Sequence, residues 1–161
     1  MAATALLGWH PGELAIQRKL GYADAVSDAW ARVGSFMPEQ HRLFHTSNLP
    51  FIPMTTLDAE GRPWASIVAG PTGDIGFVNS PDPRTLVINA RLWDGDPLLD
   101  TAKAWIGSKR PNATPERSLT AGLGIEFSTR RRNKFAGLIR RVTRRKDLEY
   151  QIHLNVSQTL G

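Results

Sequence analysis

Residues 49–91 constrain the fold more than any other stretch, because short apolar runs alternate there with turn sequences. The runs at residues 49–57 and 62–70 are rich in β-branched and aromatic residues, and an Asp-Ala-Glu-Gly segment joins them. Two such runs joined by a short loop ending in glycine are typical of a β-hairpin. Further runs at residues 76–80 and 85–89 follow at similar spacing. The stretch therefore predicts a small antiparallel sheet or barrel.

The residues before this stretch favour helices. Apolar side chains recur at helical spacing in three segments, residues 11–20, 24–33 and 38–45. Pro11 suits the first turn of a helix, and Gly21 and Gly34 suit positions just after one. We expect these three helices to pack on the outside of the sheet.

The residues after the stretch return to strands. A short amphipathic helix is predicted over residues 98–106, followed by an exposed loop at 108–118. Strand patterns follow over residues 119–127, 134–142 and 149–156. In the last of these, apolar and polar residues alternate strictly, which predicts one buried and one polar face. The buried set is Tyr150, Ile152, Leu154 and Val156, and the polar set is Gln151, His153 and Asn155.

Length and composition favour one ordinary globular unit. A chain of 161 residues is long enough to bury its own core, so we expect residues 1–161 to form a single domain, helical over 1–48 and barrel-like over 49–161. The absence of cysteine excludes disulfides, thiolate zinc sites and iron–sulfur clusters. No apolar run approaches the ~20 residues of a membrane span, and the N-terminus lacks the basic start of a signal peptide. We therefore expect a cytoplasmic protein without a membrane partner.

The net charge of +5 is distributed unevenly along the chain. Residues 117–146 hold ten Lys and Arg against one acid, Glu126, which gives this segment +9. The remainder holds ten basic and fourteen acidic residues and carries −4. A basic segment on a slightly acidic body indicates a localised anionic partner or a solvated face.

The sequence contains no standard metal or hydrolase motif. His41 and His45 have the i, i+4 spacing of a helical metal site, but no glutamate completes the His-Glu-x-x-His pattern. A Gly-x-Ser-x-Gly nucleophile elbow is also absent. We therefore predict no metal site and assign no catalytic residue.

The run Arg130-Arg131-Arg132-Asn133 allows three interpretations. It can be a solvated turn, a contact for nucleic acid, or part of a phosphate site. Ser66, Ser80 and Arg84 lie near the ends of other predicted strands, and arginine provides the forked, charge-assisted donors that a phosphate needs. These residue types favour the phosphate site without excluding the other two.

An ordered set of segments resembles one known family. The segments are residues 10–13 with Gln17, 49–53, 58–66, 77–86, 95–98 and 123–133, and together they cover most of the chain. In this order they resemble the FMN-binding split-barrel family typified by pyridoxamine 5′-phosphate oxidase, and specifically its uncharacterised flavin-nucleotide-binding branch.

The resemblance implies a mainly β (α+β) fold: a six-stranded antiparallel split β-barrel with flanking N-terminal helices, dimeric, with FMN at the dimer interface. It places Ser66 and Ile67 beside the flavin. It also places Asn79, Ser80 and Arg84 near the phosphate and ribityl chain, and Arg131, Arg132 and Asn133 near the phosphate or the ring. An oxidoreductase of unknown small-molecule substrate follows, with a separate reductase as electron donor and with nucleic acid disfavoured as a partner.

Two departures from the family keep other functions open. Ser66 stands where the oxidase itself has a phosphate-binding arginine, which argues against vitamin B6 oxidation. Relatives continue past a Gln-Ser-Phe-Gly motif, whereas this sequence ends at residues 158–161, so we interpret it as C-terminally shortened. The alternatives are a non-catalytic module for nucleic acid or another polyanion, and a degenerate split barrel without a cofactor.

Overall fold

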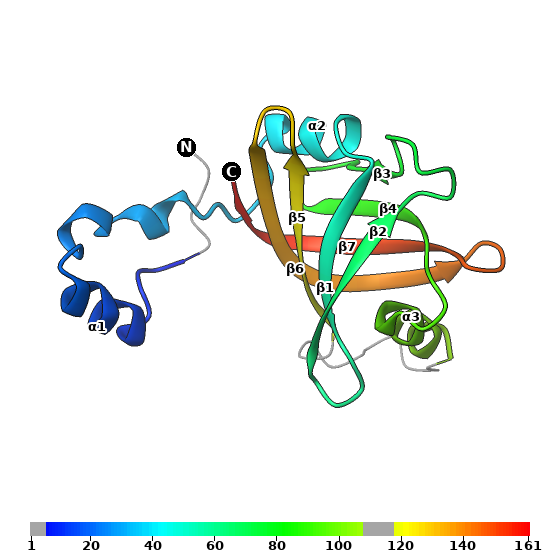
Figure 1. The fold of residues 1–161 in the computed structure, drawn as a ribbon, viewed down its shortest axis with the longest axis horizontal. Coiled ribbons are helices and arrows are strands. Elements are labelled where there is room, and N and C mark those ends of the chain that lie inside the picture. The colour runs from blue at the N-terminus through cyan, green and yellow to red at the C-terminus, as the bar shows by residue number, and fades with distance from the viewer. Residues whose placement is uncertain (1–5, 108–117) are drawn as a thin grey trace.

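The computed structural model describes residues 6–107 and 118–161, and its central feature is a closed antiparallel barrel (Figure 1). Six strands form the barrel and a short seventh, β3, flanks it, in the order β2-β1-β5-β6-β7-β4-β3 with β2 pairing β4 to close the ring. The strands are β1 Phe51–Leu57, β2 Pro63–Ala69, β3 Val78–Asn79, β4 Thr85–Arg91, β5 Leu119–Glu126, β6 Arg131–Arg144 and β7 Glu149–Leu160. The predicted mainly β barrel with flanking helices is confirmed.

The predicted first hairpin is confirmed as β1 and β2. They pair in antiparallel register from Phe51↔Ala69 to Leu57↔Pro63. Asp58 stabilises the connection, because its Oδ1 accepts the backbone N–H groups of Glu60 at 3.0 Å and Arg62 at 2.8 Å. Aspartate is favoured in turns for this local bonding, which is why the loop could be recognised from the sequence.

Alternate side chains of every long strand fill the barrel. The buried residues include Ile52 and Met54 of β1, Leu86 and Ile88 of β4, and Ile152 of β7. Burying each of these side chains stabilises the fold by about 1.5–3 kcal/mol. The predicted inward set of the last strand is confirmed, since Tyr150, Ile152, Leu154 and Val156 are all buried.

Helix α1, Pro11–Leu20, begins and ends where the sequence predicts. The His10 side chain accepts the Gly12 N–H, Glu13 bonds back to the His10 N–H, and Gly21 ends the helix with φ of 75°. The predicted helix over 24–33 is wrong: two 3-10 helices, η1 Asp24–Val26 and η2 Ala29–Arg32, occupy the segment. The backbone of Asp28, at φ −115° and ψ 9°, leaves the helical region between them, and its side chain accepts a hydrogen bond from Ser27 Oγ at 2.9 Å.

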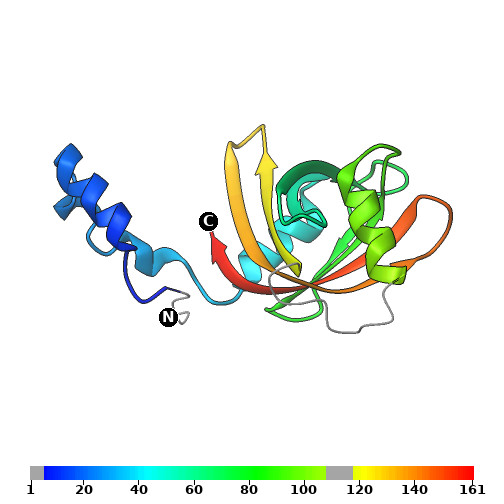
Figure 2. The same cartoon turned by 90° about the horizontal axis from the view of Figure 1, so that it is seen from below.

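Residues 6–33 form an arm that projects from the barrel instead of packing on the sheet (Figures 1 and 2). Within the arm, Trp9 Nε1 donates to Val26 O at 2.9 Å. Ile16 and Leu20, one turn apart on α1, stay exposed because no sheet lies against them. The expectation that all three N-terminal helices cover the sheet is therefore wrong for the first two.

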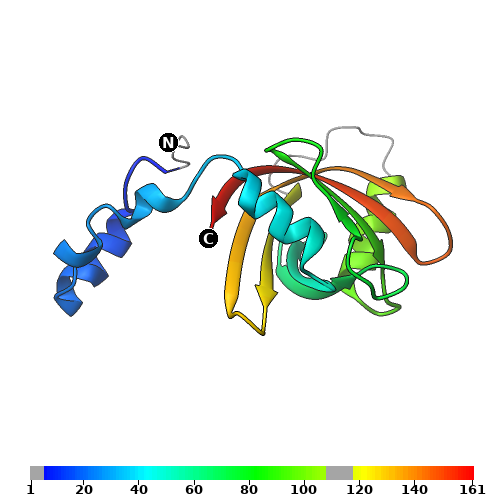
Figure 3. The ribbon, with the colours of Figure 1, turned by 90° about the horizontal axis from the view of Figure 1, so that it is seen from above.

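Helices α2 and α3 lie at opposite ends of the barrel (Figure 1). Helix α2, Glu39–Ser47, crosses one end, as the view from above shows (Figure 3), and contacts β3 and β6. Helix α3, Pro97–Gly107, contacts β1, β2 and β6. In the described part of the chain, no helix is long and apolar enough to cross a membrane.

The structure extends two of the predicted C-terminal strands. Strand β6 begins at Arg131, three residues before the predicted start at residue 134, so most of the arginine run belongs to it. Strand β7 continues to Leu160, beyond the predicted end at residue 156. Of the predicted loop at 108–118, residues 108–117 lie outside the described residues.

Candidate functional site

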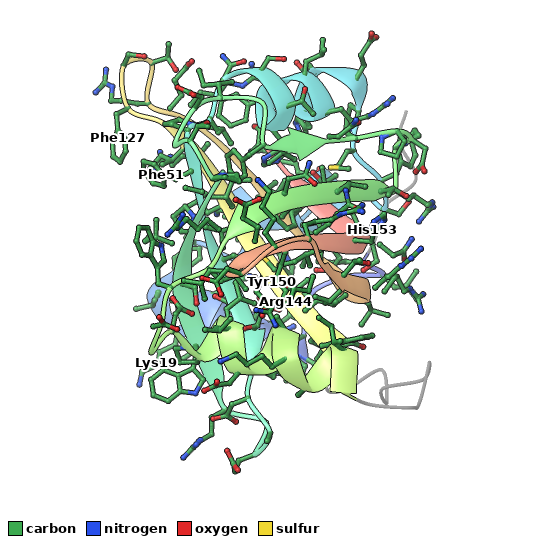
Figure 4. The ribbon with its side chains drawn as sticks, turned by 90° about the vertical axis from the view of Figure 1, so that its right-hand side faces the viewer. Lys19, Phe51, Phe127, Arg144, Tyr150 and His153 are labelled. Atoms are coloured by element: carbon green, nitrogen blue, oxygen red, sulfur yellow. The ribbon has the colours of Figure 1, made fainter. Side chains whose placement is uncertain are left out.

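The outward side of β2, β1 and β5 is largely apolar. Ile67 of β2 is 55% exposed and Phe127, just after β5, is 71% exposed. Figure 4 shows Phe51 and Phe127 on the same side of the barrel, and their ring centroids lie 6.2 Å apart. We call this surface the apolar outer face; its outward apolar side chains include Phe51, Pro53, Leu57, Ala65, Ile67, Leu119, Ala121, Leu123 and Ile125, and Thr55 of β1 faces outward among them.

Two cationic side chains border the apolar outer face on β6. Arg132 pairs in register with Ile125, and Lys134 pairs with Leu123. Both cations are exposed, and neither makes an ion pair with another described residue. An exposed apolar surface edged by unpaired cations suits a ligand with a flat apolar part and an anionic group.

Helix α2 gathers a second group of the predicted residues. Arg42 Nε donates to Ser80 Oγ at 3.1 Å, and Arg42 Nη2 donates to the Ser80 carbonyl at 2.6 Å. Arg84 Nη1 donates to the Ser35 carbonyl at 2.9 Å, just before α2. Arg131 donates to the Gln40 carbonyl at 3.1 Å and lies 4.6 Å above the Phe44 ring. These polar groups already have protein partners.

Asn133 belongs to a buried polar cluster beneath α2. His41 Nδ1 lies 3.0 Å from Thr159 Oγ1, which donates to the Lys134 carbonyl at 3.2 Å. The Asn133 Nδ2 atom and both ring nitrogens of His45 are buried without a hydrogen-bond partner among the described residues. Burial, and then the charges of His41 and Arg131, lower the pKa of His45 to about 4, so the ring is neutral at pH 7.

The remaining predicted residues lie elsewhere. Ser66 points inward, where its Oγ donates to Asp96 Oδ1 at 2.6 Å, and the same oxygen accepts the Leu98 N–H at 2.8 Å. Ser66 thus holds the first turn of α3. Asn79 is exposed on β3, opposite Val87. Of the eight predicted residues, the structure places Ile67 on the apolar outer face and Arg132 at its edge. The other six lie around α2, in the barrel interior or on β3.

Sequence reasoning missed Lys134 and Arg42. Lys134 lies two residues after Arg132, so both side chains share one face of a strand. This spacing indicates a pair of cations only if the strand begins at Arg131, as it does in the structure. Arg42 reaches Ser80 only through the tertiary packing of α2, and no local pattern indicates that contact.

Comparisons with solved structures identify the fold. The chain superposes on a candidate pyridoxamine 5′-phosphate oxidase of Lactobacillus delbrueckii with a TM-score of 0.52 at 14% identity, covering 79% of this chain and 95% of that one. An F420 reductase (TM-score 0.49, 11% identity, 76% of this chain and 98% of that one) and a HupZ variant of Group A Streptococcus (0.48, 10%, 77% and 98%) were also found.

This chain has the split-barrel fold. The similarity to the oxidase-like structure shows that much, at a sequence identity too low to assign one family within the fold. No protein-family model and no curated protein matches the chain.

Proposed function

We propose that this split barrel binds FMN on its apolar outer face, as a pyridoxamine 5′-phosphate oxidase-like flavoprotein with an oxidoreductase activity. The observation that carries the proposal is the meeting of an exposed apolar surface with Arg132 and Lys134 at its edge. Bound FMN supplies hydride or electron transfer, and the protein supplies binding and orientation. The substrate is a small molecule, and a separate reductase supplies the electrons.

The residues of the apolar outer face fit the chemistry of FMN. Ile67 and Leu123 would contact the isoalloxazine ring through apolar surface. Arg132 and Lys134 would hold the phosphate, which needs charge-assisted donors that no protein carboxylate already occupies. Ser66, Ser80 and Arg84 are bonded to protein groups, so we assign them no contact with FMN; Ser66 supports α3 from inside the barrel, and Ser80 and Arg84 hold the residues around α2.

A second copy of the chain would complete this site. The exposed apolar side chains of the barrel, which include Ile67, Leu119 and Phe127, would be covered in a homodimer. The arm adds further exposed apolar side chains at Leu7, Ile16 and Leu20. Contiguous apolar surface of this kind marks interaction sites in soluble proteins.

Titration with FMN and with riboflavin tests the proposal, because riboflavin has the same ring and no phosphate. The purified protein is expected to quench FMN fluorescence and to bind about one FMN per chain. Arg132→Ala is expected to weaken FMN binding by roughly 10-fold or more, the scale of a lost charge-assisted hydrogen bond, and to leave riboflavin binding unchanged. Arg18→Ala, an exposed arginine of the projecting arm, is the matched control.

Three results would contradict the proposal. Absence of flavin absorbance in the purified protein together with no FMN uptake would indicate a cofactor-free barrel. An equal loss of FMN binding in Arg132→Ala and Arg18→Ala would show that the site is elsewhere. An equal loss of FMN and riboflavin in Arg132→Ala would show that Arg132 does not hold the phosphate.

A further inference from the structure

A second outer face, on β4, β7 and the second half of β6, is polar and basic. His153 of β7 pairs with Val87 of β4 on one side and with Arg141 of β6 on the other. Figure 4 shows His153 on the side of the barrel opposite Phe51 and Phe127. We call this surface the basic outer face; its side chains include Val87, Asn89, Arg91, Arg141, Thr143, Arg145, Glu149, Gln151 and His153.

The basic outer face has more positive charge than its own acids neutralise. Residues 140–146 contain five Lys and Arg, and the adjoining hairpin supplies two acids, Asp147 and Glu149. Those acids lie 3.5 Å from Arg144 and 4.0 Å from Lys146, respectively. Within the described residues, Arg91, Arg140 and Arg141 make no ion pair and are exposed.

An amide network orders the side chains of this face. Gln151 Nε2 donates to Asn89 Oδ1 at 2.9 Å, and Gln151 Oε1 lies 3.0 Å from His153 Nε2. The same Gln151 oxygen accepts a hydrogen bond from Arg145. Partial burial lowers the pKa of His153, and the charges of Arg141 and Arg145 lower it further.

An exposed aromatic residue adjoins the basic hairpin. Strand β4 ends at Arg91, which pairs with Glu149, and the next residue is fixed to the hairpin by the Leu92 N–H, which donates to the Leu148 carbonyl at 2.8 Å. Trp93 follows and is 57% exposed. The sequence separates Trp93 from the basic run by about fifty residues, so only the tertiary pairing brings them together.

We propose that the basic outer face binds single-stranded nucleic acid, with phosphates at Arg91, Arg141 and Arg145 and a base stacked on Trp93. A basic surface that tracks the backbone beside an aromatic ring is the arrangement that sequence-tolerant single-strand binders use. An anionic membrane fits less well, because the outward residues beside the arginines are the polar Asn89 and Gln151, which offer hydrogen bonds rather than apolar surface to insert.

Fluorescence anisotropy of a fluorescein-labelled oligo-dT of about 20 nucleotides tests the proposal between about 50 and 200 mM salt. Arg141→Ala and Arg141→Gln are expected to weaken binding and to reduce the log–log salt slope by about 0.7, the value of one released counterion. Trp93→Ala and Trp93→Leu are expected to weaken binding about tenfold at every salt concentration and to leave the slope unchanged. Arg18→Ala is again the matched control.

The combination of a changed slope at Arg141 and an unchanged slope at Trp93 would support the proposal. Absence of binding at the lowest salt would overturn it, and so would an Arg18→Ala effect equal to that of Arg141→Ala. Vesicles of anionic phospholipid serve as the competitor. If they displace all of the oligonucleotide from the original protein but displace none from the Trp93→Leu protein, the face is a membrane surface and the proposal is overturned. Circular dichroism of each variant checks that the barrel is still folded.

Discussion

Each half of strand β6 contains an exposed arginine, but the surroundings of the two arginines differ. In the first half, Arg131 is held by α2: it donates to the Gln40 carbonyl at 3.1 Å and lies 4.6 Å above the Phe44 ring. In the second half, Arg141 is outward and exposed, and its guanidinium has no hydrogen-bond or ion-pair partner among the described residues. The basic segment that the sequence presents as continuous is therefore two separate clusters at opposite ends of one strand.

The role of each arginine depends on the element that packs against it. Helix α2 offers a carbonyl and an aromatic ring, and these two groups occupy the guanidinium in place of a ligand. The β4 and β7 strands offer amides and a histidine, which order the surface while leaving positive charge available. One long strand can thus contribute to structure at one end and to binding at the other.

Gly137 lies between the two halves, and its substitution is expected to have the largest effect. The register between β6 and β7 shifts between Ala136 and Gly137, and a Cβ at Gly137 would lie 1.9 Å from the Asn155 carbonyl oxygen. Because that neighbour is backbone, Gly137→Ala is expected to lower the free energy of unfolding by about 3 kcal/mol or more. Urea denaturation measures the loss.

Gly107→Ala is the control for this prediction, since nothing lies within 4 Å of a Cβ there. Its expected effect is neutral or slightly stabilising, because alanine is the better helix former near the end of α3. If the Gly137→Ala and Gly107→Ala proteins are equally stable, the close approach of β6 to the Asn155 carbonyl at Gly137 is not required for the fold.

Much of the barrel was predictable because its signals are local. The first hairpin followed from turn chemistry around Asp58, and the inward face of β7 followed from strict alternation at Tyr150, Ile152, Leu154 and Val156. Short-range bonding and period-2 alternation depend on residues that are close in the sequence, so both can be recognised without knowing the tertiary packing.

The candidate site was less predictable because it depends on which side of a strand faces outward. Strand β1 has apolar residues on both sides, so periodicity alone could not show that Pro53 faces out while Ile52 faces in. The predicted strand began at residue 134 instead of Arg131, so the prediction did not place Arg132 and Lys134 on the same strand face. The proximity of Trp93 to the basic hairpin depends on the pairing of Leu92 with Leu148, which no local pattern encodes.

The histidines near the two halves of β6 provide a prediction of acid sensitivity. His45 is 1% exposed beside Phe135 and has no hydrogen-bond partner among the described residues, whereas His153 is bonded to Gln151 on the outer face. Because the folded pKa of His45 is about 4 and the unfolded value is near 6.5, the unfolded chain binds more protons between these pH values. Stability is therefore full above about pH 6.5 and falls by about 2–3 kcal/mol as the pH drops to 4.

Denaturation at a series of pH values checks this prediction with His45→Leu and His153→Asn. The His45→Leu protein is expected to lose most of the pH dependence in that window. Some dependence should remain, because the pKa values of His41 and His153 are also lowered by burial, and then by Arg131 for His41 and by Arg141 and Arg145 for His153. A pH profile in His45→Leu that matches the original protein would contradict the assignment.

The smallest expected effect distinguishes the two arginines themselves. Arg131→Ala removes the hydrogen bond to the Gln40 carbonyl and the contact with the Phe44 ring, so it is expected to lower the free energy of unfolding by about 1 kcal/mol. Arg141→Ala removes no described partner and is expected to change stability by less than about 0.5 kcal/mol. Urea denaturation of both variants measures the difference, and equal losses would show that Arg141 also has a structural role. A loss at Arg131 alone would establish that the two halves of β6 differ in energy as they do in contacts, because charge, strand and residue type are the same in both substitutions.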